Sequence, residues 1–214
     1  MSTSERPDRA AGVDVGAGRV HAVALARRAG RLEVTGRYEG GATSDLVRFC
    51  DGAGRVAVDA PGEPSRGAHR EDMAVAAKFR GGRCSEIPVP GTPAVSWVTP
   101  PAGNPVPGWM LTGFEVWHRL RGAGLRAVET YPAAAYHRLN GGRWPPRKST
   151  GPGRAARLAL LRPYLHLPPE AAGWSHDTLD AAVAALVAAT GAPLPHRCPE
   201  PDGSRMWLPA RAGV

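Results

Sequence analysis

Three acidic residues stand within or at the ends of short apolar segments. Asp14 lies inside one such segment, and Asp59 and Glu129 follow the apolar runs 56–58 and 127–128. Aspartate is depleted in strands, and a buried carboxylate is costly unless a metal ion or another partner satisfies it. Because ligands of parallel α/β sheets collect outside the carboxyl ends of the strands, we expect these acids to point into one crevice.

Two further aspartates, Asp177 and Asp180, are three positions apart, which places them on one side of a helix N-terminus. The residues at 181–185 are mostly alanine, so this helix can approach the sheet closely. Capping is the alternative, because Ser175 or Asp177 could be the N-cap and Asp180 could complete the capping interaction. Glu129 could likewise be a structural hydrogen-bond acceptor.

Carboxylates gathered without soft ligands suit hard divalent cations, Mg²⁺ or Mn²⁺. In two-metal sites, such ions activate water on one side of a phosphodiester and stabilise the leaving oxygen on the other. Lys148, in a basic loop at 141–153, could stabilise charge on the departing group, and Trp144 in the same loop could stack on an unpaired base. Each is otherwise a solvated surface residue. We predict as metal ligands Asp14, Asp59, Asp177 and Asp180, and as catalytic residues Asp14, Asp59, Glu129, Asp180 and Lys148.

The elements that must position these residues follow a simple order. Three segments with alternating apolar residues, at 11–15, 20–27 and 31–38, predict an antiparallel meander. The proline-rich stretch 88–107 predicts a long loop. Helices are expected from Ser44 and at 69–79, 109–121, 155–165 and 177–189, and strands at 55–59, 125–130 and near 206–208.

This order predicts an α/β fold of the RNase H-like type. Three antiparallel strands are followed by alternating helix and strand, which gives a mixed sheet of order 3-2-1-4-5 flanked by helices. A chain of 214 residues fits one domain. We therefore expect a disordered tail at 1–10 and a single domain at 11–214.

Composition indicates the partner and the compartment. The net charge of +8 and the pI of about 10.2 favour nucleic acid, although a bias toward arginine, alanine, glycine and proline across the chain explains them equally well. No secretory signal is present, and the longest apolar run, 181–189, is too short for a bilayer. We expect a cytoplasmic protein with no membrane partner; its oligomeric state stays open.

Several common motifs are absent from the sequence. The three cysteines form no C-x-x-C pair, so neither a zinc knuckle nor a disulfide framework is predicted, and reduced thiols are expected. Gly16 and Gly18 lack the third glycine of a dinucleotide-binding turn.

An ordered set of short motifs extends over most of the chain. It consists of Gly12-Val13-Asp14, Val58-Asp59-Ala60-Pro61, Trp109-Met110, Glu129-Thr130-Tyr131-Pro132 and His176-Asp177 with Asp180-Ala181. This set resembles domain-of-unknown-function family 429, which is predicted to contain RNase H-like nucleases. The resemblance runs from about Gly12 to about Leu208, although the loose segment 62–67 departs from the charged helix usual in the family.

The resemblance implies the RNase H-like fold and acidic site residues at Asp14, Asp59, Glu129 and Asp180. It also places Asp177 close to the site and favours a lysine in the loop that contains Lys148.

Together, these observations predict an enzyme, a divalent-metal-dependent nuclease that uses a carboxylate-held two-metal mechanism. DNA or RNA, and endo- or exonucleolytic cleavage, stay open. One alternative is an ATP-dependent phosphotransferase of the actin-like superfold, but its second phosphate loop is not evident. Another is a non-catalytic nucleic-acid-binding module, which would gain nothing from carboxylates facing phosphates.

Overall fold

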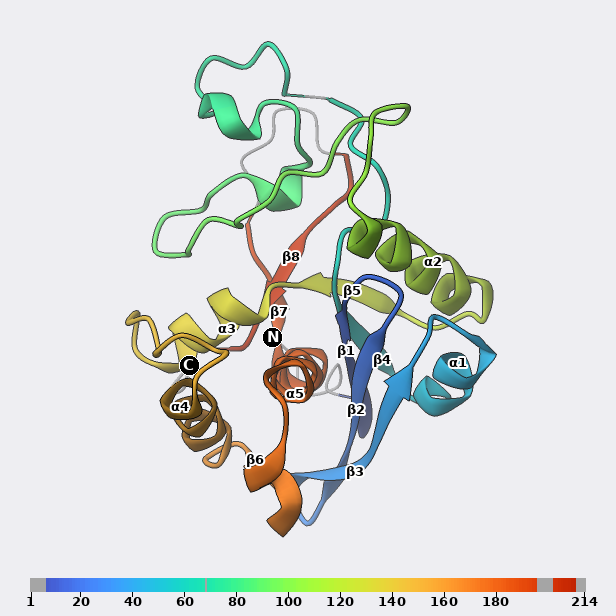
Figure 1. Cartoon of the computed structure of the whole chain (residues 1–214), viewed down its shortest axis with the longest axis vertical. Helices are drawn as coiled ribbons and strands as arrows, with labels where there is room; N and C mark the ends of the chain where they lie inside the picture. The colour runs from blue at the N-terminus through green and yellow to red at the C-terminus, as the bar shows by residue number, and fades with distance from the viewer. Residues whose placement is uncertain (1–6, 68, 196–201, 211–214) are drawn as a thin grey trace.

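The chain folds around one mixed β-sheet, seen in a computed structural model that describes residues 7–67, 69–195 and 202–210. Within these residues the sheet has eight strands in the order β6-β3-β2-β1-β4-β5-β8-β7. It curls around helix α5, with α1 and α2 on its outer face (Figure 1). The strands are β1 (Arg9–Val15), β2 (Val20–Arg28), β3 (Arg31–Gly40), β4 (Arg55–Asp59), β5 (Ala127–Thr130), β6 (Leu165–His166), β7 (Ala192–Pro193) and β8 (Met206–Leu208).

The five central strands have the predicted order, β3-β2-β1-β4-β5. β1 pairs antiparallel with β2 and parallel with β4, and β4 pairs parallel with β5. The RNase H-like fold class is therefore confirmed. The helices are α1 (Ser44–Cys50), α2 (Gly108–Gly122), α3 (Pro132–Leu139), α4 (Gly151–Leu161) and α5 (His176–Thr190), with short 3-10 turns at η2 (Ala77–Phe79), η3 (Cys84–Glu86) and η4 (Pro169–Gly173).

Three expectations need correction. β1 begins at Arg9, so residues 9 and 10 belong to the sheet and not to a tail. The helix predicted at 69–79 does not form, and only η2 lies there. Helix α3 was not expected, although Pro132 stands in its first turn, where proline is well tolerated. The single domain at 11–214 remains a proposal.

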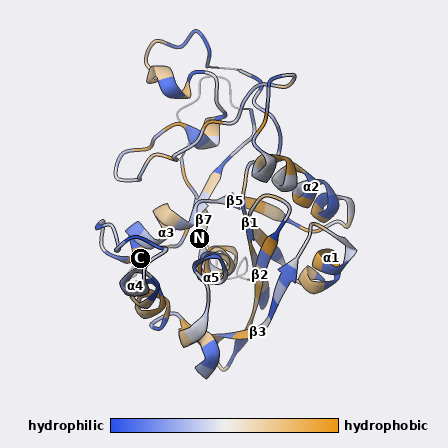
Figure 2. Ribbon diagram, viewed as in Figure 1, coloured by the Kyte–Doolittle hydropathy of each residue, from blue (hydrophilic) through white to orange (hydrophobic). Residues whose placement is uncertain are grey.

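Close packing of α5 on β1 fixes the centre of the molecule. A Cβ at Gly12 would lie 2.0 Å from the backbone nitrogen of Ala185 and 2.3 Å from the carbonyl oxygen of Ala181, so only glycine fits there. The small residues predicted to allow this approach are buried along the helix. Figure 2 shows apolar residues on β1, β2 and α5 at the centre of the fold.

The segment 60–107 between β4 and α2 is mostly irregular. It rises above the sheet (Figure 1) and has a small apolar cluster of its own, which includes Phe79 and Ile87. The predicted loop at 88–107 forms part of it. This segment contributes part of one wall of the candidate site.

Two remaining features concern the thiols and the membrane. Cys50 is free and buried, whereas Cys84 is disulfide-bonded, so the expectation of reduced thiols is wrong for Cys84. Cys198 lies outside the described residues. In the described part of the chain, no helix has the length and apolar character required to cross a bilayer.

Candidate active site

Asp14 and Asp59 meet at the carboxyl ends of two neighbouring strands. β1 and β4 are parallel, and Asp14 is the register partner of Asp59, so both side chains project from the same face of the sheet. This is the face that packs on α5, since Gly12, two residues before Asp14, contacts that helix. The two carboxyl groups are electrostatically coupled, since the charge of Asp14 raises the pKa of Asp59.

Helix α5 brings two more carboxylates to the same place. Its N-cap is Ser175, whose Oγ accepts a hydrogen bond of 3.1 Å from the backbone nitrogen of Thr178. Asp177 and Asp180 are therefore not needed as the cap, which settles the alternative left open by the sequence. Asp180 is buried, whereas Asp177 is half-exposed.

The cluster of Asp14, Asp59 and Asp180 is electrostatically strained. Burial, followed by the charge of Asp180, raises the pKa of Asp14 to about 8 against the opposing effect of Lys148. Burial and the charge of Asp14 hold the pKa of Asp59 well above its ordinary value. Burial also raises the pKa of Asp180, although Lys148 and Arg157 oppose it. The cluster therefore retains a proton at neutral pH and has too few cations for its carboxylates.

Lys148 is the principal counter-charge. Its Nζ donates a hydrogen bond of 2.8 Å to Oδ2 of Asp180, and the Nε of Arg157 lies 3.7 Å from the other oxygen of this carboxylate. Nearly half of the Lys148 side chain is exposed, at 46%, while that of Asp180 is 4% exposed. Lys148 thus reaches from solvent to the buried acids, which matches the predicted position of a cation beside the crevice.

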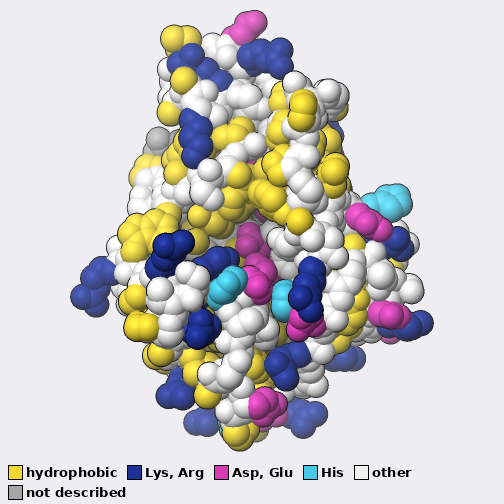
Figure 3. Space-filling model, in the orientation of Figure 1, with side chains coloured by type: hydrophobic (Ala, Val, Ile, Leu, Met, Phe, Trp, Pro, Cys, Tyr) yellow, Lys and Arg dark blue, Asp and Glu magenta, His cyan; other side chains and the backbone are white. Residues whose placement is uncertain are grey.

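Asp14, Asp59 and Lys148 line a cleft of about 480 Å³. Figure 3 shows acidic side chains at the bottom of this hollow, with apolar side chains above them and basic side chains and histidines beside them. The lining comprises Asp14, Val15, Gly16, Arg19, His21, Asp59, Ser96, Trp97, Trp109, Lys148 and Asp177.

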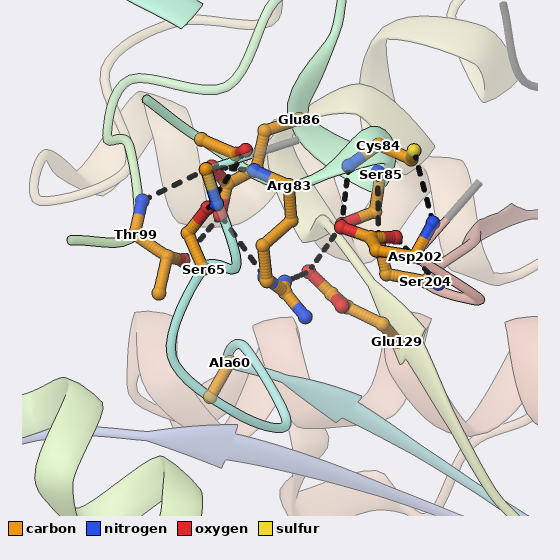
Figure 4. Close-up of polar contacts among 12 residues, drawn as sticks. Ala60, Ser65, Arg83, Cys84, Ser85, Glu86, Thr99, Glu129, Asp202 and Ser204 are labelled. Carbon is orange, nitrogen blue, oxygen red and sulfur yellow. Dashed lines mark hydrogen bonds and ion pairs between the residues drawn. The ribbon is translucent and has the colours of Figure 1, made fainter. Parts of the chain in front are cut away.

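Glu129 is not part of this cluster, so its predicted convergence with the other acids is wrong. It is the register partner of Val58, one residue before Asp59, and therefore points to the opposite face of the sheet. There it is buried and accepts hydrogen bonds from Arg83 and, at 3.4 Å, from Oγ of Ser85 (Figure 4). Burial raises the pKa of Glu129 to about 7 despite the opposing charge of Arg83. The structural alternative for Glu129 is the one the geometry supports.

The bonding of the acids indicates whether a divalent ion suits them. Their oxygens are the ligand type that Mg²⁺ and Mn²⁺ take, and Oδ1 of Asp59 is buried with no hydrogen-bond partner among the described residues. However, within the described ranges no group of three or more His, Cys, Asp or Glu residues is placed to hold an ion as it stands. Asp180 is instead bonded to Lys148. The donor chemistry fits a hard cation, and a complete ligand set requires Asp180 or Asp177 to reorient.

Three lining residues were missed from the sequence. His21 is the register partner of Asp14 across the turn between β1 and β2, and its Nε2 lies 3.9 Å from Oδ2 of Asp177. This pairing could have been found by counting outward from the Gly16 turn. Trp97 carried no comparable signal, because its position depends on how the irregular segment 60–107 folds. Trp109 stands in the short motif Trp109-Met110, but no role was predicted for it.

The sequence matches a family model described as "Protein of unknown function (DUF429)" over residues 12–202. This confirms the resemblance drawn from the short motifs. Among curated proteins the sequence has no significant match. A solved structure described as Thermus thermophilus RuvC is 12% identical, with 82% of this chain and 92% of that chain covered and a TM-score of 0.44. At that distance it assigns no residue a role.

Proposed function

We propose that this chain, which belongs to the DUF429 family of proteins of unknown function, is a nuclease that requires divalent metal ions. It hydrolyses phosphodiester bonds of DNA or RNA in the cytoplasm by a carboxylate-held two-metal mechanism. The observation that carries this proposal is the pair of buried Asp14 and half-buried Asp59 that lines a solvent-open cleft, with Oδ1 of Asp59 left without a hydrogen-bond partner among the described residues.

A structural role explains this pair poorly. Two neighbouring acids removed from water destabilise the fold unless something else compensates them. The raised pKa of Asp14, due first to burial and then to Asp180, reflects that penalty. Strongly perturbed carboxyl groups in a cleft are typical of functional sites, and bound cations would relieve the penalty.

Asp14 and Asp59 would hold the metal ions, with Asp180 and Asp177 beside them. When bound, the ions supply positive charge that polarises a phosphodiester and favours the ionisation of water. The side chains of the cleft bind the phosphate and orient water. Lys148 neutralises Asp180 at rest, and its exposed Nζ can donate instead to a phosphate oxygen at the mouth of the cleft. Asp177 and His21 also line the cleft, with Nε2 of His21 3.9 Å from Oδ2 of Asp177, and can orient a water molecule by hydrogen bonds.

The helix also favours charge at this point. Asp177 is in the first turn of α5 and Asp180 follows it, near the positive end of the helix dipole. The dipole partly stabilises the ionised carboxylates of Asp177 and Asp180.

The test is a cleavage assay on labelled single-stranded, double-stranded and hairpin DNA and RNA, with Mg²⁺, Mn²⁺ or EDTA. We expect cleavage with either metal, none in EDTA, and loss of about 100-fold or more in Asp14→Asn. The matched control is Asp51→Asn, which removes an aspartate charge from an exposed position after α1. Metal-independent cleavage, or full activity in Asp14→Asn, would refute the proposal.

A further inference from the structure

One wall of the cleft is aromatic. Trp97, from the irregular segment, and Trp109, from the first turn of α2, both line the cleft that has Asp14 and Asp59 at its floor. Their ring centroids are 5.2 Å apart at an interplanar angle of 83°. Behind them, Tyr131 meets Trp97 edge to face at 4.9 Å. We call Trp97 and Trp109 the aromatic wall.

Trp97 is held by polar contacts of the backbone on both sides of it. Before it, Nζ of Lys78 donates hydrogen bonds of 3.3 Å to the carbonyl oxygens of Val95 and Ser96. After it, the backbone nitrogen of Thr99 donates a 3.0 Å bond to Oε2 of the buried Glu86. The backbone that carries Trp97 is therefore pinned, although the ring itself is only partly buried.

Glu86 is itself fixed by a network that reaches the sheet. It accepts hydrogen bonds from the backbone nitrogen and Nε of Arg83, at 3.1 Å and 3.3 Å, and Arg83 continues to Glu129 on β5 (Figure 4). The carboxylate that the sequence suggested for catalysis thus anchors the segment that positions Trp97. Such prior ordering lowers the entropic cost of binding a ligand on the wall.

Trp109 is positioned by a hydrogen bond between α2 and the turn after β1. The backbone nitrogen of Gly18 donates a 2.9 Å hydrogen bond to Oγ1 of Thr112, one turn further along α2. This bond ties the start of α2 to the turn that follows Asp14. Both members of the aromatic wall are therefore placed relative to the acidic floor by bonds between distant parts of the chain.

The charges in the cleft do not explain how a polyanion would stay there. Arg19 and Lys148 line it, but so do Asp14, Asp59 and Asp177, and Arg19 is paired with Glu39. Attraction from the +8 net charge acts over the whole surface and not in this hollow. Short-range contacts must supply the local affinity, and the aromatic wall is the apolar surface available for them.

We infer that Trp97 and Trp109 form a nucleobase-binding subsite, and that the substrate has an unpaired base beside the scissile phosphate. This inference rests on the proposed function. Stacking on aromatic rings holds any base regardless of sequence. A volume of about 480 Å³ is in the range of sites for small ligands. It suits a nucleotide better than a base pair held inside a duplex, whose bases are stacked and not available to the wall. The base comes from a single strand or is extruded from a duplex.

The aromatic wall also has a hydrogen-bond donor available for a polar atom of a ligand. The indole Nε1 of Trp97 is buried and has no hydrogen-bond partner among the residues that the structure describes. Buried donors in folded proteins are almost always satisfied. An acceptor on a bound base or ribose would satisfy this one.

The experiment measures binding in EDTA by fluorescence anisotropy, so that cleavage does not interfere. The probes are labelled oligothymidylate, oligouridylate, a fully paired hairpin and the same hairpin with one unpaired base. The variants are Trp97→Ala, Trp97→Phe and Trp109→Ala. Trp144→Ala is the control, because Trp144 is 59% exposed, contacts His137 and is not among the lining residues of the cleft.

We expect Trp97→Ala and Trp109→Ala to bind the single strands and the bulged hairpin roughly 5- to 150-fold more weakly, the range that loss of one stacked base gives. Trp97→Phe should stay within about fivefold of wild type, and Trp144→Ala should not change. The fully paired hairpin should bind weakly and equally to all variants. The ratio between variant and wild type should persist at high salt, because stacking is not screened.

Either of two results would overturn the inference. One is unchanged affinity for unpaired bases in Trp109→Ala, or in Trp97→Ala, when circular dichroism shows that the variant is folded. The other is equal losses on paired and unpaired probes. Absence of cleavage with metal would instead refute the proposed function and leave the binding result standing.

Discussion

Replacing Asp14 by asparagine should make the metal-free protein more stable, not less. The folded-state pKa of Asp14, raised to about 8 by burial and by Asp180, lies above the ordinary value of 3.8. Between these two values the folded protein binds more protons than the unfolded chain does. Its stability therefore falls as the pH rises through that window, and the Asp14 penalty is complete above pH 8.

The size of the effect has an upper bound. A tenfold change in proton affinity is worth about 1.4 kcal/mol, so a rise from 3.8 to about 8 corresponds to at most about 6 kcal/mol. Asp59 keeps its own burial penalty in the variant, and the asparagine must still be buried. We therefore expect Asp14→Asn to gain roughly 1–3 kcal/mol at pH 8, or roughly 2–10 °C in Tm.

The assay is urea and thermal denaturation in EDTA from pH 4 to pH 9, for wild type, Asp14→Asn and the control Asp51→Asn. The gain should be near zero at pH 4, grow with pH and level off near pH 8. Addition of Mg²⁺ at pH 8 should stabilise wild type and narrow the difference. A variant that is less stable than wild type at pH 8, or a gain that does not depend on pH, would show that Asp14 is not strained as described.

Three other variants test separate parts of the structure. Lys148→Ala should lower single-turnover cleavage about 100-fold and affinity less than tenfold, because its charge serves the transition state; equal losses at two salt concentrations would make it a simple phosphate contact. Arg83→Met should reduce the free energy of unfolding by about 3–5 kcal/mol, since Glu86 and Glu129 lose their buried cation; an unchanged urea midpoint would contradict this. Gly12→Ala should cost about 3 kcal/mol or more, because its Cβ has no room against α5; wild-type stability in urea would exclude so tight a contact.

The strand order and the meeting of Asp14 with Asp59 were predictable from the sequence. Asp14 lies near the end of one short apolar run and Asp59 follows another, and the carboxyl ends of parallel strands lie at one edge of a sheet. The approach of α5 was also predictable, because alanines after Asp180 leave room for a backbone at Gly12. These features depend on local periodicity and side-chain size, which a sequence displays directly.

The position of Glu129 was not predictable by the same rule. The rule identifies the end of a strand but not the face, and a shift of one residue moves a side chain to the other side of the sheet. Glu129 is the penultimate residue of β5, whereas Asp59 is the last of β4. Its partner Arg83 is far away in the sequence. The residues near Glu129 therefore gave no indication that Glu129 forms an ion pair.

The aromatic wall was beyond prediction for a related reason. Trp97 lies in a proline-rich stretch that has no periodicity to interpret, and its position follows from bonds such as that of Thr99 to Glu86. The exposed Trp144 looked equally suited to stacking in the sequence, yet it lies outside the lining of the cleft. Tertiary contacts alone determine which tryptophan lines the cleft that contains the acidic residues.

The most direct test of the central claim is a crystal structure with Mn²⁺, phased so that manganese is located by its anomalous signal. The account predicts anomalous peaks at the cleft floor, bonded to Asp14 and Asp59, with Lys148 displaced from Asp180. The same experiment on Asp14→Asn should lose these peaks. Crystals of wild type that bind manganese elsewhere, or not at all, while Lys148 keeps its hydrogen bond to Asp180, would contradict the account.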